Sequence, residues 1–97
     1  MIPTTKALHA VRGAREAQDV MKLEGRFEFT CADDELSDDE RLTILVEEVG
    51  EVARAIHQRL PGELRAELIQ VAAVALAWIE NTDLRRRAAA KAAREAL

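Results

Sequence analysis

The chain has few of the residues that mark disulfide-rich or β-rich proteins. Its 97 residues include one cysteine, two phenylalanines, one tryptophan and no tyrosine. A lone cysteine, Cys31, cannot form an intramolecular disulfide, which points to a reducing compartment. Prolines and glycines are scarce, and β-branched residues form none of the alternating apolar and polar runs that a half-buried strand needs. These absences exclude an all-β fold and favour helices.

Long apolar runs and a strong positive charge are also missing. The longest weakly polar run, residues 68–79, is well short of the roughly 20 apolar residues that span a bilayer. No basic and apolar leader precedes Lys6, so we expect a cytoplasmic protein with no membrane partner. The formal net charge is −4, and the one basic cluster is formed by Arg85, Arg86 and Arg87. Such a balance argues against a nucleic-acid partner.

The segments with helical periodicity predict three to four helices in one domain, residues 1–97. The first helix is expected at residues 7–24, with Gly25 as its stop signal. A third is expected at residues 63–80, after the break at Pro61 and Gly62. Residues 81–83 offer caps for a fourth segment, so that residues 84–97 form a basic, alanine-rich C-terminal helix or tail.

The second helix has the clearest start signal. Ser37 and Glu40 form a capping box, in which each side chain accepts a hydrogen bond from the other residue's backbone amide. An apolar stripe then follows helical spacing and predicts the core-facing side: Leu42, Leu45, Val49, Val52, Ile56 and Leu60. Before this helix, residues 26–34 predict an ordered loop that lays Phe27 and Phe29 on the bundle, with a short extended piece as the alternative.

The expected third helix is apolar around nearly its whole circumference. A helix of this kind is normally buried on every side, which three or four short helices of one chain cannot achieve. We therefore predict an all-α small helical bundle that is completed by homo-oligomerisation, as a homodimer or homotetramer.

Acidic side chains flank the apolar stripe of the second helix. On a helical wheel Glu48 and Glu51 lie to one side of the stripe, together with Ile44 and Ala55. Because this flank also carries apolar residues, we expect it to meet something other than bulk water. Glu47 points further away and is expected to be solvated.

Polar residues also interrupt the apolar third helix. Glu67 and Gln70 lie one turn apart, and a carboxylate removed from water needs a cation, a metal or a proton. In an antiparallel hairpin they fall within about one turn of the height of Glu48 and Glu51. Oxygen ligands of this kind suit Mg²⁺, or Mn²⁺, whereas zinc favours histidine and cysteine. Glu-rich helix faces are usually only solvated, so this metal site is a hypothesis.

Residues 45–56 and 64–73 resemble the MazG-like all-α nucleoside triphosphate pyrophosphohydrolases. The family pattern is Glu-Glu-x-x-Glu, a spacer, and then Glu-x-x-Asp, and the likeness covers most of residues 11–80. The resemblance implies a Mg²⁺-dependent cleavage of a nucleoside triphosphate to the monophosphate and pyrophosphate. It also implies that Glu48, Glu51 and Glu67 are metal ligands, with Glu48 and Glu51 close to the chemistry.

One position departs from the family pattern, because Gln70 stands where the family has aspartate. A glutamine offers a carbonyl oxygen to a metal but has no charge and cannot act as a base. Two alternatives therefore stand beside an active enzyme: a catalytically impaired member that binds nucleotide or metal, and a helical oligomer that serves only as an interaction module.

Three further side chains are candidates for substrate binding. Lys22 and Arg54 are available to hold phosphate oxygens, as is the arginine cluster 85–87, although each charge taken alone is more often solvated. Trp78 is placed to stack on a base, although an aromatic residue within an apolar helix more often belongs to the core.

Overall fold

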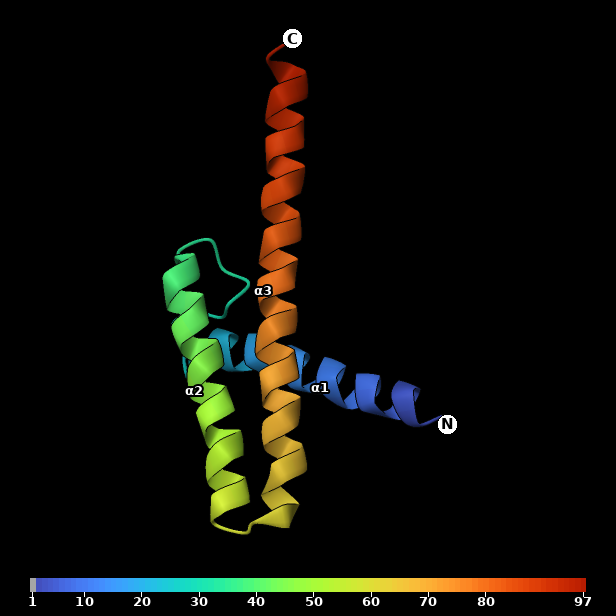
Figure 1. Ribbon diagram of the computed structural model, residues 1–97. Coiled ribbons are helices and arrows are strands. Elements are labelled where there is room, and N and C mark those ends of the chain that lie inside the picture. The colour runs from blue at the N-terminus through green and yellow to red at the C-terminus, as the bar shows by residue number, and fades with distance from the viewer. Residues whose placement is uncertain (1) are drawn as a thin grey trace.

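A computed structural model describes residues 2–97, in which three α-helices and no strand are present (Figure 1). The helices are α1 (Pro3–Leu23), α2 (Asp38–His57) and α3 (Pro61–Glu95). α2 and α3 lie side by side as an antiparallel hairpin, and α1 crosses α3 (Figure 1). The predicted all-α character is confirmed. Within the described part of the chain, no helix has the length and apolarity needed to cross a membrane.

Local sequence signals set most helix ends. The capping box of α2 is present: Ser37 Oγ accepts from the Glu40 amide at 3.1 Å, and Glu40 Oε1 accepts from the Ser37 amide at 3.0 Å. Gly25 follows α1 with a φ of +78°, a left-handed conformation that glycine adopts without strain. α1 begins at Pro3 instead of residue 7, and α3 at Pro61 instead of residue 63. Proline suits the first helical turn, where its missing N–H is not needed.

The predicted break at residues 81–83 is wrong, because α3 continues through it for 35 residues in all. Asn81 does not cap a helix: its Nδ2 donates to the loop before α2, at the Ala32 carbonyl oxygen (3.1 Å) and at Asp34 Oδ1 (2.8 Å). Thr82 Oγ1 donates back to the Trp78 carbonyl oxygen at 3.0 Å, which is compatible with an unbroken helix. The alanine-rich end of α3 therefore extends beyond the hairpin (Figure 1).

Only part of the predicted stripe of α2 packs within the chain: Leu45 packs against the core cluster, and Val52 and Leu60 are half-buried. Leu42, Val49 and Ile56 are each about half exposed, whereas Arg41 and Ala55 are buried. The buried face instead contains Arg41, Glu48 and Ala55 at heptad spacing. Small side chains on α3 explain why this face of α2 is buried, since Ala73 and Ala77 are completely buried and allow close approach of the two helices.

As expected, the single chain does not bury the third helix on every side. Leu68, Ile79 and Leu84 of α3 are 50%, 56% and 52% exposed. Leu68 and Ile79 lie on the side of α3 opposite Ala73 and Ala77, which are completely buried where α1 and α2 pack. Leu84 lies on the same side as Ala73 and Ala77, about two turns beyond Ala77.

Candidate functional site

A cavity of about 230 Å³ lies where the loop between α1 and α2 meets the α2–α3 hairpin. Each of these three elements contributes a pair of lining residues: Thr30 and Cys31, Ile44 and Glu48, and Gln70 and Val74. The apolar side of the cavity continues into a core cluster of Cys31, Val74 and Ala77. Burial raises the pKa of the Cys31 thiol, so this cysteine behaves as a packed apolar group and not as a nucleophile.

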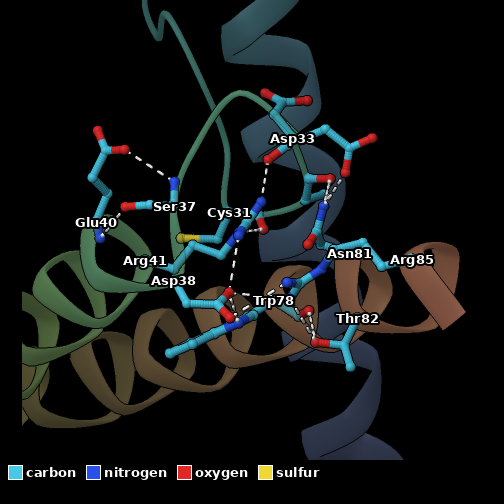
Figure 2. A network of polar contacts seen from close by, with 12 residues as sticks. Cys31, Asp33, Ser37, Asp38, Glu40, Arg41, Trp78, Asn81, Thr82 and Arg85 are labelled. Carbon is cyan, nitrogen blue, oxygen red and sulfur yellow. Dashed lines mark hydrogen bonds and ion pairs between the residues drawn. The ribbon is translucent and has the colours of Figure 1, made fainter.

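The loop wall of the cavity is fixed by Arg41, which is 2% exposed (Figure 2). Its Nε donates to the Cys31 carbonyl oxygen at 2.9 Å, and its Nη2 donates to the Asp33 carbonyl oxygen. Its Nη1 donates to Asp38 Oδ1 at 3.0 Å, within the first turn of α2. A buried guanidinium is tolerated because most of its donors have partners. Arg41 therefore ties the loop to the start of α2.

A second group of polar contacts joins this corner to α3 (Figure 2). Asp38 accepts from Trp78 Nε1 at 3.1 Å and from Arg85 Nη2 at 3.0 Å. The hydrogen bond from Arg85, together with that from Arg41, lowers the pKa of Asp38 below its ordinary value. Asn81 is completely buried beside the loop, and its Oδ1 has no hydrogen-bond partner among residues 2–97.

Glu48 is the predicted site residue with the most distinctive surroundings. It is half-buried and lines the cavity, and burial raises the pKa of its carboxyl group above the ordinary value of 4.5. The charges of Glu67 and Glu51 raise this pKa further, with Glu47 contributing in the same direction. The structure therefore brings Glu48 near Glu67 across the hairpin. Glu67 itself is half-buried, and Gln70 is exposed at the edge of the cavity.

The remaining predicted acidic residue, Glu51, has its own partner. Glu51 Oε2 accepts from Arg54 Nε at 2.9 Å, and its side chain is 49% exposed. Arg54 also donates to Glu63 Oε2 and Gln58 Oε1, each at 3.2 Å. The ion pairs with Glu51 and Glu63 are exposed, where such pairs contribute little stability.

The other two candidates for substrate binding are also engaged. Lys22 Nζ lies 2.7 Å from Asp33 Oδ1, so this lysine ties α1 to the loop. Trp78 packs beside the core cluster and donates its indole N–H to Asp38. The alternative of a core tryptophan therefore describes its surroundings better than a free stacking surface.

The acidic residues around Glu48 lie near one another, but their carboxylates do not meet at one point. Among the residues that the structure describes, no group of three or more His, Cys, Asp or Glu side chains is arranged to hold a metal ion. The donors near Glu48 still suit a hard cation in their chemistry, since Glu67, Glu51 and Gln70 all offer oxygen. Neutralising this group requires either a proton, as the raised pKa of Glu48 indicates, or a cation.

Sequence reasoning missed Arg41, which fixes the loop, and the role of Asn81. Arg41 had a detectable signal: it lies seven residues before Glu48 and fourteen before Ala55, on the same face of α2. Asn81 had none, because its partners Ala32 and Asp34 are distant in the sequence.

Comparison of the chain with known protein families, with curated proteins and with solved structures found no match. The resemblance of residues 45–56 and 64–73 to the MazG-like enzymes stays a prediction from the motif.

Proposed function

We propose that this chain is a Mg²⁺-dependent nucleoside triphosphate pyrophosphohydrolase of the MazG-like type, with Mn²⁺ as an alternative ion. The observation that carries the proposal is the position of Glu48. Its carboxyl group lines the cavity, is half-buried, and has a pKa raised by burial and by Glu67 and Glu51. Acidic groups pressed together in this way bind a divalent cation favourably, because the cation removes their mutual repulsion.

In this proposal Glu48, Glu51, Glu67 and Gln70 supply the oxygen ligands. Mg²⁺ held by these residues would screen the triphosphate charges and would lower the pKa of a water molecule. Glu48 or Glu51 accepts the proton of the attacking water. The exposed ion pair between Glu51 and Arg54 exchanges at small cost, which frees Glu51 for the cation and Arg54 for a phosphate oxygen. Lys22 is available to a second phosphate oxygen if it leaves Asp33.

A catalytically impaired nucleotide-binding or metal-binding member is the second candidate function. It is favoured by Gln70, which stands where the family has a charged ligand, and by the ion pair of Glu51 with Arg54, which already neutralises that carboxylate. Both features weaken the attraction for a cation. An oligomeric interaction module with neither metal nor nucleotide is the third candidate.

Homo-oligomerisation is part of the proposal and is supported by two uncovered heptad stripes. On α2 the exposed apolar residues Leu42, Val46, Val49 and Ile56 follow steps of four, three and seven. On α3, Leu68 and Ile79 lie on one stripe with the half-buried Ala72 and Ala75. Because the two helices are neighbours, their stripes suit the hairpin of a second copy, in a four-helix bundle.

The oligomer is tested by light scattering on the wild type and on Val49→Glu. The wild type should be a homodimer or homotetramer, and Val49→Glu should dissociate it because a charge is placed within the stripe. Leu8→Glu, which changes an exposed apolar residue of α1, serves as the control. A monodisperse wild-type monomer at micromolar concentration would contradict this part of the proposal.

A cytoplasmic location also belongs to the proposal, because the one cysteine, Cys31, is free and buried and needs no oxidising compartment.

The activity is tested by incubating the protein with canonical ribonucleoside and deoxyribonucleoside triphosphates and Mg²⁺, and separating the products by anion-exchange chromatography. The enzyme should release pyrophosphate and a nucleoside monophosphate. Glu48→Gln should abolish the release, while Glu47→Gln, a matched change on the same helix, should keep it. Nucleotide binding without release supports the impaired member instead, and absence of both supports the interaction module.

A further inference from the structure

The cavity has a second part that the metal chemistry does not use. Beyond Glu48 and Gln70 it is lined by Gln18 of α1 and by Phe27 and Phe29 of the loop. These three residues have no assigned role in the proposed function. Their combination of one amide with two aromatic rings is typical of a site for a small planar ligand with a polar edge.

Gln18 is unusual because its residue is 8% exposed and yet it takes part in no side-chain hydrogen bond within residues 2–97. Its amide atoms are not fully buried. Among residues 2–97, Asn81 Oδ1 is the sole side-chain nitrogen or oxygen atom that is fully buried and has no hydrogen-bond partner. The amide of Gln18 is therefore open to the cavity. An amide that reaches an open cavity and has no protein partner is available to a ligand that offers a complementary donor and acceptor.

The two phenylalanines provide the matching apolar surface. Phe27 and Phe29 are 40% and 37% exposed, although both line the cavity, so their rings lie partly uncovered at its edge. The opposite walls include Ile44 and Val74, which are also apolar. Aromatic rings at an open edge are suited to stack on the face of a flat heterocycle.

We infer that this part of the cavity binds the nucleobase of the substrate, with Gln18 pairing to its polar edge and Phe27 and Phe29 contacting its face. The volume of about 230 Å³ is below the roughly 300–1,000 Å³ of sites that enclose a whole drug-sized ligand, so it suits a nucleobase and leaves the phosphates outside. The inference rests on the proposed function in one respect: Glu48 and Gln70 at the same cavity place the triphosphate beside the base.

The test uses nucleosides without phosphate, in EDTA, so that it does not depend on metal or turnover. Cytidine, uridine, adenosine and guanosine are titrated separately and followed by amide chemical shifts. At least one of the four nucleosides should shift the signals of cavity residues, and Gln18→Leu should weaken its binding about tenfold, as loss of one or two hydrogen bonds implies. Gln58→Leu, the same substitution at an exposed glutamine, should bind like the wild type. Phe29→Leu gives a second, milder change, and circular dichroism checks that each variant is folded.

The outcomes separate this inference from the proposed function. Absence of nucleoside-induced shifts at the cavity, or equal binding by Gln18→Leu and the wild type, would overturn the inference. If the enzyme releases pyrophosphate and Gln18→Leu leaves its base preference unchanged, the inference fails and the proposed function stands. If a nucleoside binds through Gln18 and no pyrophosphate is released, the inference stands and the proposed function fails.

Discussion

Replacing Arg41 with methionine should cost the fold a large part of its stability. Methionine keeps most of the aliphatic volume but removes the donors to the carbonyl oxygens of Cys31 and Asp33. Asp38 retains its contacts with Trp78 and Arg85, so the loss falls mainly on the two carbonyl groups. Hydrogen bonds to a charged group contribute about 1.5–3 kcal/mol each, so the loss of two gives about 3–6 kcal/mol. For a domain of this size that corresponds to a fall in Tm on the order of 15–30 °C.

The assay is urea denaturation followed by circular dichroism, at one fixed protomer concentration because association also stabilises the folded state. Arg12→Met is the matched control, since Arg12 is 80% exposed and pairs with Glu16 one turn away. Exposed pairs of this kind contribute about 0.3–0.5 kcal/mol. If Arg41→Met and Arg12→Met lose the same small amount of stability, below about 1 kcal/mol, then Arg41 does not hold the loop in the way described.

Three further predictions concern charged groups around the cavity. Burial, followed by the charge of Glu67, raises the pKa of Glu48 in the folded protein. The free energy of unfolding of the metal-free protein should therefore fall as pH rises from about 4.5 through that pKa. Glu48→Gln should remove this fall and have a higher Tm than the wild type at pH 7 in EDTA. Gln70→Asp should increase the rise in Tm caused by Mg²⁺, because it adds a negative charge to the acidic group around Glu48. The position is exposed, so the new carboxylate is solvated. An unchanged response would argue against Gln70 as a ligand. For Asp38, whose pKa is lowered first by Arg85, the stabilisation is present above the unfolded value of 3.8 and lost as pH falls through the folded pKa. Asp38→Asn should therefore lower Tm at pH 7 and match the wild type at low pH, which a Tm series against pH checks.

The parts of the fold that depend on neighbouring residues could be predicted from the sequence. The capping box at Ser37 and Glu40 and the stop at Gly25 act within a few residues, and both are present. The break at Asn81 was wrong because that side chain bonds to Ala32 and Asp34, far away in the sequence. A cap residue and a residue that anchors a distant loop look the same in a sequence.

Periodicity also failed to tell which face of α2 packs within the chain. Leu42, Val49 and Ile56 form the more apolar stripe, but Arg41 and Ala55 are the buried residues. An apolar stripe shows that a face avoids water, and does not show whether its partner belongs to the same chain. The side of the helix that carries Glu48 and Ala55 was expected to avoid bulk water, and Ala55 is indeed 1% exposed.

The candidate site also has one part that local patterns predict and another part that they do not. Helical geometry and a tight turn were enough to place Glu48 and Glu67 on facing parts of a hairpin, where burial and then the charge of Glu67 raise the pKa of Glu48. The contributions of Gln18, Phe27 and Phe29 depend on how α1 crosses α3 and on the path of the loop, which no local pattern specifies.

The central claim is that the acidic groups around Glu48 hold a divalent cation, and its most direct test is a calorimetric titration of the metal-free protein with Mg²⁺. The wild type should bind Mg²⁺, and Glu48→Gln and Glu67→Gln should each weaken the affinity at least tenfold, because each removes a charged oxygen ligand. Glu47→Gln, a neutralisation on the same helix, should bind like the wild type. Absence of binding by the wild type, or equal affinity in all four proteins, would contradict the claim.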